Sequence, residues 1–120
     1  MPGLPAFVLK KLYVKGSLKN TDGGFSLSIS NTLAPGTITS VAPLQIDGQV
    51  YPLEKTSLQV GETSLPAGEV SPTSPYQFPL NVAATIRVAG EALSPGMHQI
   101  VITVKTQEVG ELKIAVSDTI

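Results

Sequence analysis

The sequence contains no cysteine and no tryptophan, and its single histidine is His98. The lack of cysteine excludes disulfides, thiolate nucleophiles, iron–sulfur clusters and thiolate zinc sites. A metal site needs several histidines or carboxylates that converge, and one histidine does not provide them. We therefore expect no metal site, no cofactor and no catalytic residue in this chain.

Charged residues are also scarce, at 14% of the chain against about 25% in typical domains. Eight basic and nine acidic residues leave a net charge of −1. The one basic cluster, over residues 10–19, holds four lysines and a single aromatic residue, Tyr13. Nucleic-acid-binding domains gather basic residues on one face and interleave stacking aromatics. The sequence therefore predicts no nucleic-acid partner.

Long hydrophobic runs are missing as well. No stretch approaches the roughly 18 apolar residues that a membrane helix requires. Near the start of the chain, Lys10 and Lys11 follow a short apolar run, whereas a secretory signal has its basic residues first. We expect a cytoplasmic protein without a membrane partner.

Helical periodicity is absent, whereas strand periodicity recurs along the chain. Apolar residues alternate with serines over 25–30, which predicts one face toward the core and one toward water, and alternation returns over 82–88. Residues 7–14, 97–105 and 112–116 have the composition of further strands. Turn signals separate these segments. The pattern predicts an all-β fold, a single antiparallel β-sandwich domain over residues 1–120, immunoglobulin-like or jelly-roll-like, with about seven or eight strands.

Four local signals predict how the strands are joined or interrupted. The Pro-Gly pairs at 35–36 and 95–96 each fit the centre of a type II turn. Asp47 and Gly48 predict a tight hairpin. Pro43 predicts a bulge or an edge position within the segment 37–46.

The segment 61–80 is rich in proline and glycine, which exclude a helix and any long central strand. Connections of this length are uncommon inside compact domains and are often functional. A crossover between the two sheets is the favoured interpretation, and a binding loop is the alternative.

His98 is the main candidate for chemistry, because imidazole titrates near neutral pH. It could be a lone ligand or base at a subunit boundary. The favoured alternative is a turn residue whose ring bonds a nearby backbone carbonyl. No serine lies in a Gly-x-Ser-x-Gly elbow, so a Ser-His-Asp triad is not indicated.

A ligand or partner surface is the second kind of candidate site. The carboxylates lie mostly in turns, where they serve turn geometry and solubility, and only Glu54 closely follows an aromatic residue and a proline. Tyr13, Tyr51 and Tyr76 could stack on a sugar, although tyrosines in sandwich strands are more often half-buried at the rim. The residues that we single out as partner or ligand contacts are His98, Tyr51, Tyr76 and Glu54.

Several short pieces of the chain, in this order, resemble the small β subunit of C-glycoside deglycosidases. The similarity extends from about residue 8 to residue 104 and rests on residues 16–20, 24–25, 46–48, 84–88 and 93–98, with Pro52 shortly after the third piece. That resemblance implies a β-rich accessory subunit without activity of its own, bound to a larger catalytic subunit. The alternatives are a carbohydrate-binding or self-assembling sandwich protein and, third, a small autonomous enzyme that depends on His98.

Composition also favours self-association, because 42% of the residues are hydrophobic and few charges remain to cover the outer faces. Residues 100–104 lack the charges and prolines that protect an exposed edge, so this strand should lie inside a sheet. Residues 7–13 carry Lys10 and Lys11, which is typical of a terminal strand. We therefore predict a homo-oligomer in which residues 1–12 contribute to the interface.

Overall fold

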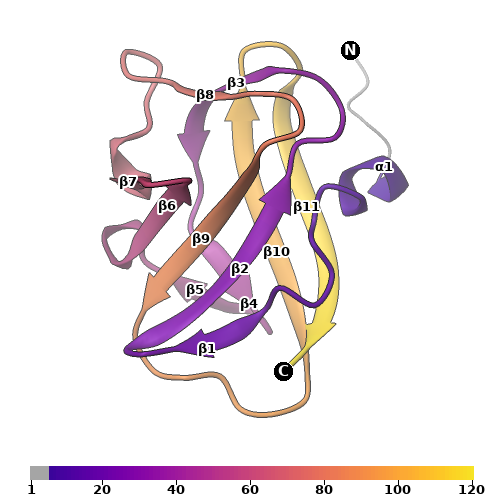
Figure 1. Ribbon diagram of the computed structural model, residues 1–120, viewed down its shortest axis with the longest axis vertical. Helices are drawn as coiled ribbons and strands as arrows, with labels where there is room; N and C mark the ends of the chain where they lie inside the picture. The colour runs from indigo at the N-terminus through magenta and orange to yellow at the C-terminus, as the bar shows by residue number, and fades with distance from the viewer. Residues whose placement is uncertain (1–5) are drawn as a thin grey trace.

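The computed structural model describes residues 6–120 and shows two antiparallel β-sheets packed face to face (Figure 1). Every strand pairing is antiparallel, and the buried apolar residues form one cluster between the sheets. The predicted all-β sandwich is confirmed. There are more strands than predicted, because several have only three or four residues.

The first sheet has five strands and contains the serine-rich strand β2. The strands lie in the order β1 (Lys19–Thr21), β2 (Gly24–Ser30), β9 (Ala83–Ala89), β6 (Thr56–Val60) and β7 (Thr63–Pro66). In β2 the apolar side chains face the core as predicted, but the serine face is shielded and Ser26 is buried. The serine side chains of β2 are therefore not open to water, contrary to the expectation from the sequence.

The second sheet is arranged around β10 (Met97–Thr106). Strand β11 (Gly110–Thr119) pairs with β10 along its whole length on one side. Strands β3 (Gly36–Val41) and β4 (Leu44–Ile46) pair with β10 one after the other, and β8 (Tyr76–Phe78) and β5 (Gln49–Tyr51) pair with β3 and β4. The apolar segment 100–104 therefore lies inside a sheet, as predicted.

Pro43 interrupts what is otherwise one long strand. Residues 42 and 43 separate β3 from β4, and the Ala42 N–H still donates to the Thr103 carbonyl of β10, at 2.9 Å. Proline lacks an N–H and cannot continue the ladder. The interruption predicted at Pro43 is confirmed.

The three predicted turns have different outcomes. Asp47 and Gly48 have φ angles of 54° and 82° and join β4 to β5, which confirms the hairpin and is typical of a type I′ turn. Gly96 has a φ of 121°, in the positive region that a type II turn requires. Gly36 has no positive φ and is the first residue of β3, so the predicted type II turn at 35–36 is wrong.

The predicted strand at 7–14 is wrong. Residues Ala6–Lys10 form a short helix, α1, and only Tyr13 makes an isolated β-bridge, to Ile29 of β2. Leu9, Leu12 and Tyr13 are buried, and their spacing of three and four residues is that of one helical face. Lys10 and Lys11 are exposed on the solvent side of this helical turn and do not belong to an edge strand. Phe7 remains 66% exposed.

The N-terminal segment, which was predicted to contribute to an oligomer interface, pairs with its own chain. The Val14 N–H donates to the Ser28 carbonyl and the Ser30 N–H donates to the Leu12 carbonyl, so residues 12–14 extend the first sheet of their own chain. Residues 1–5, including the prolines at 2 and 5, lie outside the described residues. The homo-oligomer with an interface at residues 1–12 stays a prediction, and residues 7–13 form a helix and a turn in this chain instead of the expected strand.

The segment 61–80 holds short elements. It contains β7 of the first sheet, the 3-10 helix η2 (Ala67–Glu69) and β8 of the second sheet. Ala67 and Val70 are buried in the core, so part of the segment packs against the sandwich. A second 3-10 helix, η1 (Leu53–Lys55), follows β5.

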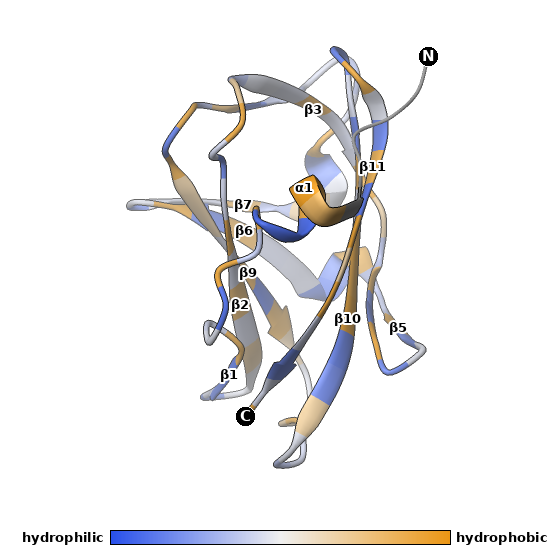
Figure 2. Ribbon diagram, turned by 90° about the vertical axis from the view of Figure 1, so that its right-hand side faces the viewer, coloured by the Kyte–Doolittle hydropathy of each residue, from blue (hydrophilic) through white to orange (hydrophobic). Residues whose placement is uncertain are grey.

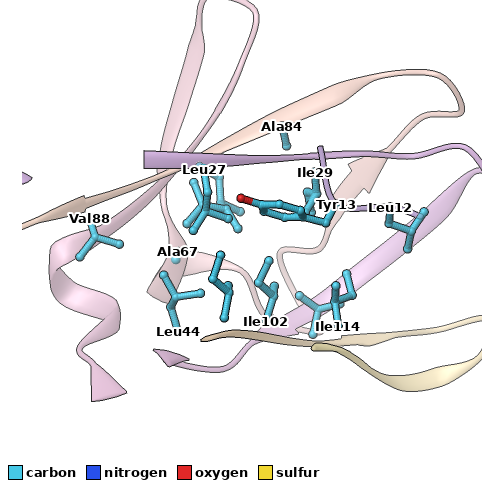
Figure 3. Packing of buried hydrophobic residues seen from close by; sticks show 14 of the residues in the cluster. Leu12, Tyr13, Leu27, Ile29, Leu44, Ala67, Ala84, Val88, Ile102 and Ile114 are labelled. Atoms are coloured by element: carbon cyan, nitrogen blue, oxygen red, sulfur yellow. The ribbon is translucent and has the colours of Figure 1, made fainter. Parts of the chain in front are cut away.

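The core lies between the two sheets (Figure 3). Figure 3 shows Leu27 and Ile29 of the first sheet opposite Leu44, Ile102 and Ile114 of the second. Among the described residues, no helix is long and apolar enough to cross a membrane.

A buried carboxylate closes one side of the sandwich. Asp118 of β11 accepts a hydrogen bond from the Tyr13 hydroxyl at 2.6 Å and from the backbone N–H of Gly16 at 2.8 Å. The Leu18 N–H, at 3.4 Å, contacts the same oxygen, and the Thr119 N–H, at 2.8 Å, donates to the other. The N-terminal segment is thereby held beside the edge strand β11, where α1 lies between the edges of the two sheets (Figure 2).

Gly24 has a packing requirement that gives a first test. A Cβ atom at Gly24 would lie 1.9 Å from the Val88 carbonyl oxygen, and the backbone there cannot move aside. We expect Gly24→Ala to lower the free energy of unfolding by about 3 kcal/mol or more. At Gly36 a Cβ would meet only Glu108 Oε1, at 4.0 Å, so Gly36→Ala should change stability by less than about 0.5 kcal/mol. Urea denaturation of both variants makes the comparison, and equal stabilities would contradict the packing at Gly24.

The Tyr13–Asp118 hydrogen bond gives a second test. Burial raises the pKa of Asp118, but the Tyr13 hydroxyl and three backbone N–H groups outweigh it, so its pKa is lowered. Its contribution to stability is thus present above the unfolded pKa, near 3.9, and is lost as pH falls through the folded value. We expect Tyr13→Phe to cost about 2 kcal/mol at neutral pH and to move acid unfolding to higher pH. Tyr76→Phe is the control, because burial is the sole cause of the raised pKa of Tyr76.

Candidate functional site

A groove of about 560 Å³ opens at the end of the sandwich where β9 ends and β10 begins. The loop 90–96 joins these two strands at the bottom of Figure 1. The β4–β5 hairpin, Pro52 and the last residue of η1, Lys55, form the opposite wall. The ionisable or aromatic residues that line the groove are Asp47, Tyr51, Lys55, Glu91 and His98.

Asp47 is placed by the type I′ turn. Aspartate tolerates the left-handed conformation that the first central position of this turn requires, and Asp47 has a φ of 54°. Its N–H donates to the Gln99 carbonyl, and its Oδ1 accepts the Gln99 N–H, both at 2.8 Å. The turn is thus fastened to the first residues of β10.

Both ring nitrogens of His98 make hydrogen bonds within the protein. Its Nδ1 lies 2.6 Å from Asp47 Oδ2 and its Nε2 lies 2.7 Å from the Ser94 carbonyl oxygen. A carbonyl oxygen only accepts, so Nε2 donates, and a proton on Nδ1 as well suits the facing carboxylate. The hydrogen bond to Ser94 and then that to Asp47 raise the pKa of His98. The side chain of His98 is only 7% exposed.

The contacts of Asp47 lower its pKa, whereas those of His98 raise the pKa of the imidazole. The Gln99 N–H and then the His98 ring lower the pKa of Asp47. Both groups are therefore stabilised in their charged forms, as an imidazolium and a carboxylate. Because each ring nitrogen is occupied within the protein, His98 has no lone pair to offer as a base or as a ligand.

Tyr51 provides the aromatic wall of the groove. Its ring meets Phe25 edge to face, with centroids 5.1 Å apart and an interplanar angle of 79°. Burial and then the charges of Asp47 and Glu91 raise the pKa of Tyr51. The Tyr51 ring therefore packs against Phe25 of the core and also lines the groove.

The other candidates from the sequence lie elsewhere. Tyr76 is on β8, where its ring packs at 6.1 Å from that of Phe78. Glu54 belongs to η1 and is not among the residues that line the groove. Tyr13 is buried, so the three tyrosines do not share a face. Of the four candidate contacts, the structure brings only His98 and Tyr51 together.

The sequence did not point to Asp47 or Glu91. Asp47 was recognised as a turn residue, but its pairing with His98 joins positions 51 residues apart. The available signal was the Asp-Gly turn placed directly after a strand that could pair with 97–105. Glu91 carries no motif.

In chemical terms the groove is suited to binding. No group of three or more potential metal ligands occurs among residues 6–120. The rim has two carboxylates and one lysine, and the one imidazole is already engaged. This arrangement offers fixed hydrogen-bonding and aromatic surfaces instead of a proton-transfer pair.

Comparison with known proteins gives one family. The model of the family described as "Hydroxymethylglutaryl-CoA reductase, N-terminal domain" matches residues 8–120, which include all the strands. A comparison with curated proteins gives no match.

This match corrects the resemblance to the small β subunit of C-glycoside deglycosidases, which is wrong. The role as accessory subunit of such an enzyme is wrong with it, and the carbohydrate-binding alternative gains no support. Each piece that carried the resemblance is short. Pieces such as 46–48 and 93–98 are turn-and-strand sequences, which fix a backbone course that many sandwiches share.

The Asp47–His98 pair makes stability depend on pH. The contribution of His98 is complete below about pH 6.5, its unfolded pKa, and is lost as pH rises through its higher folded pKa. That of Asp47 is present above about pH 3.9 and is lost as pH falls through its lowered folded pKa. We expect the native chain to lose stability between about pH 5.5 and about pH 9, and Asp47→Asn, which keeps the turn, to lose less. Urea denaturation at both pH values tests this, and parallel losses would contradict it.

Proposed function

Because the chain belongs to the hydroxymethylglutaryl-CoA reductase N-terminal domain family, we propose that it works in a hydroxymethylglutaryl-CoA reductase by docking onto the part of the enzyme that carries out the reduction. The observation that carries this proposal is the match over residues 8–120, which covers both sheets. The Asp47–His98 groove is the surface that we assign to the docking.

The charges of the groove argue for a protein segment over the substrate. A coenzyme A thioester carries phosphates, and phosphate sites are built from basic residues and helix N-termini. The groove instead presents Asp47 and Glu91 together with Lys55 and the protonated His98, which is already paired with Asp47. It therefore has no excess of positive charge to bind the polyanionic part of the substrate.

The same surface suits a basic side chain from the rest of the enzyme. A lysine or arginine could lie between Glu91, whose charge His98 does not neutralise, and the Tyr51 ring, where ion pairing and cation–π attraction add. Tyrosine is also enriched at protein interfaces. The clamp between His98, Asp47 and Ser94 fixes the groove in advance, which lowers the entropic cost of docking.

Binding of this chain to the catalytic part of a hydroxymethylglutaryl-CoA reductase from the same source tests the proposal. Titration calorimetry should give a saturable complex. We expect Glu91→Arg to weaken it about tenfold, because a reversed charge at the rim repels a basic partner.

Glu62→Arg is the matched control, since Glu62 is also an exposed acidic residue, lies in the β6–β7 turn and does not line the groove. It should bind like the native chain. Absence of a complex would refute the docking role, and equal weakening by both substitutions would refute the assignment to the groove.

A further inference from the structure

An apolar cavity of about 350 Å³ lies between the sheets at the other end of β10. Its walls come from both sheets and from the N-terminal segment, through Leu12, Ile29, Ile38, Phe78, Val104 and Ile114. Figure 3 shows Leu12, Ile29 and Ile114 projecting into the core from these different elements. From His98 to Val104 the strand rises about 20 Å, so the cavity is separate from the groove.

A break in strand register explains why the sheets leave space here. The pairing of β10 with β3 shifts between Lys105 and Thr106, which marks a β-bulge at the level of the cavity. A bulge bends its strand and increases the local twist. The ribbons of the two sheets diverge toward this end of the sandwich (Figure 2).

The polar side chains in the wall are occupied by the protein itself. Asn31 donates to the carbonyls of Ala34 and Phe78, both at 2.8 Å, and its oxygen faces the N–H groups of Leu33 and Ala34. The Thr106 hydroxyl donates to the Gly110 carbonyl and accepts from the Val109 N–H, both at 3.1 Å. The interior therefore offers an occupant apolar contacts only.

We propose that this cavity binds the hydrocarbon part of a small molecule, with a neutral polar group at its mouth. The volume corresponds to about a dozen groups of water size, at roughly 30 Å³ each. An apolar cavity of about 150 Å³ already binds benzene, and ligand pockets begin near 300 Å³. The occupant is thus a chain or ring system of about ten carbon atoms.

Glu108 selects the group at the mouth. It lines the cavity, is exposed, and its Oε1 accepts the Thr37 N–H at 2.9 Å. This hydrogen bond lowers the pKa of Glu108, so the mouth carries a negative charge at neutral pH. A neutral alcohol or amide is therefore preferred over a carboxylate of the same length.

Titration of the full chain with 1-decanol, followed by methyl NMR, tests the cavity. We expect saturable shifts of Ile29, Ile38 and Ile114 and little change at Ile46, whose side chain lines the groove and not the cavity. Ala34→Phe should weaken binding about tenfold, because Ala34 lines the cavity, is exposed, and makes its hydrogen bonds only through backbone atoms.

Ala92→Phe is the control, an exposed loop alanine that lines the groove instead. It should bind decanol like the native chain. Decanol shifts that do not saturate, or that Ala34→Phe leaves unchanged, would overturn the proposal.

Decanoate tests the charge at the mouth. We expect it to bind about threefold more weakly than decanol at low salt, and Glu108→Gln, which keeps an acceptor for Thr37, to reduce this difference. Equal affinities in the native chain would overturn the preference for a neutral group. Cooperative unfolding of each variant establishes that loss of binding is not loss of the fold.

Discussion

The closure of the sandwich depends on one buried carboxylate. Two sheets packed face to face leave an open side at each pair of edges, and apolar side chains there would meet water. Asp118 of β11 closes one of these sides by accepting hydrogen bonds from the Tyr13 hydroxyl and from three backbone N–H groups. With the N-terminal segment held there, Leu9, Leu12 and Leu18 complete the core.

Strand β10 relates the two ends of the molecule. It is paired on both sides along most of its length, and the groove begins at its first residues while the cavity lies beside its last. A strand bonded on both sides does not shift easily. The two sites are therefore held at a fixed separation, and each can be altered without the other.

The sequence allowed the sandwich to be predicted because its information is local. The core-facing apolar residues of β2 and β9, the Asp47–Gly48 turn and the break at Pro43 each follow from neighbouring residues and were predicted correctly, whereas the serine face of β2 was wrongly expected to face water. The helix at 6–10 was missed because five residues are too few for periodicity to outweigh β-forming composition. The Asp47–His98 pair and the Tyr13–Asp118 bond join positions far apart in the chain, and no local pattern specifies which distant residues meet.

The pairing of β2 with β9 joins segments that lie far apart in the chain. Phe25 lies opposite Val88, about sixty residues later, whereas the β4–β5 and β10–β11 hairpins join neighbours in sequence. Closing so long a loop costs chain entropy before any contact compensates for it. Isolated hairpins form in microseconds, so we expect the hairpins of the second sheet to form before the pairing of β2 with β9, which brings together strands on either side of the segment 61–80.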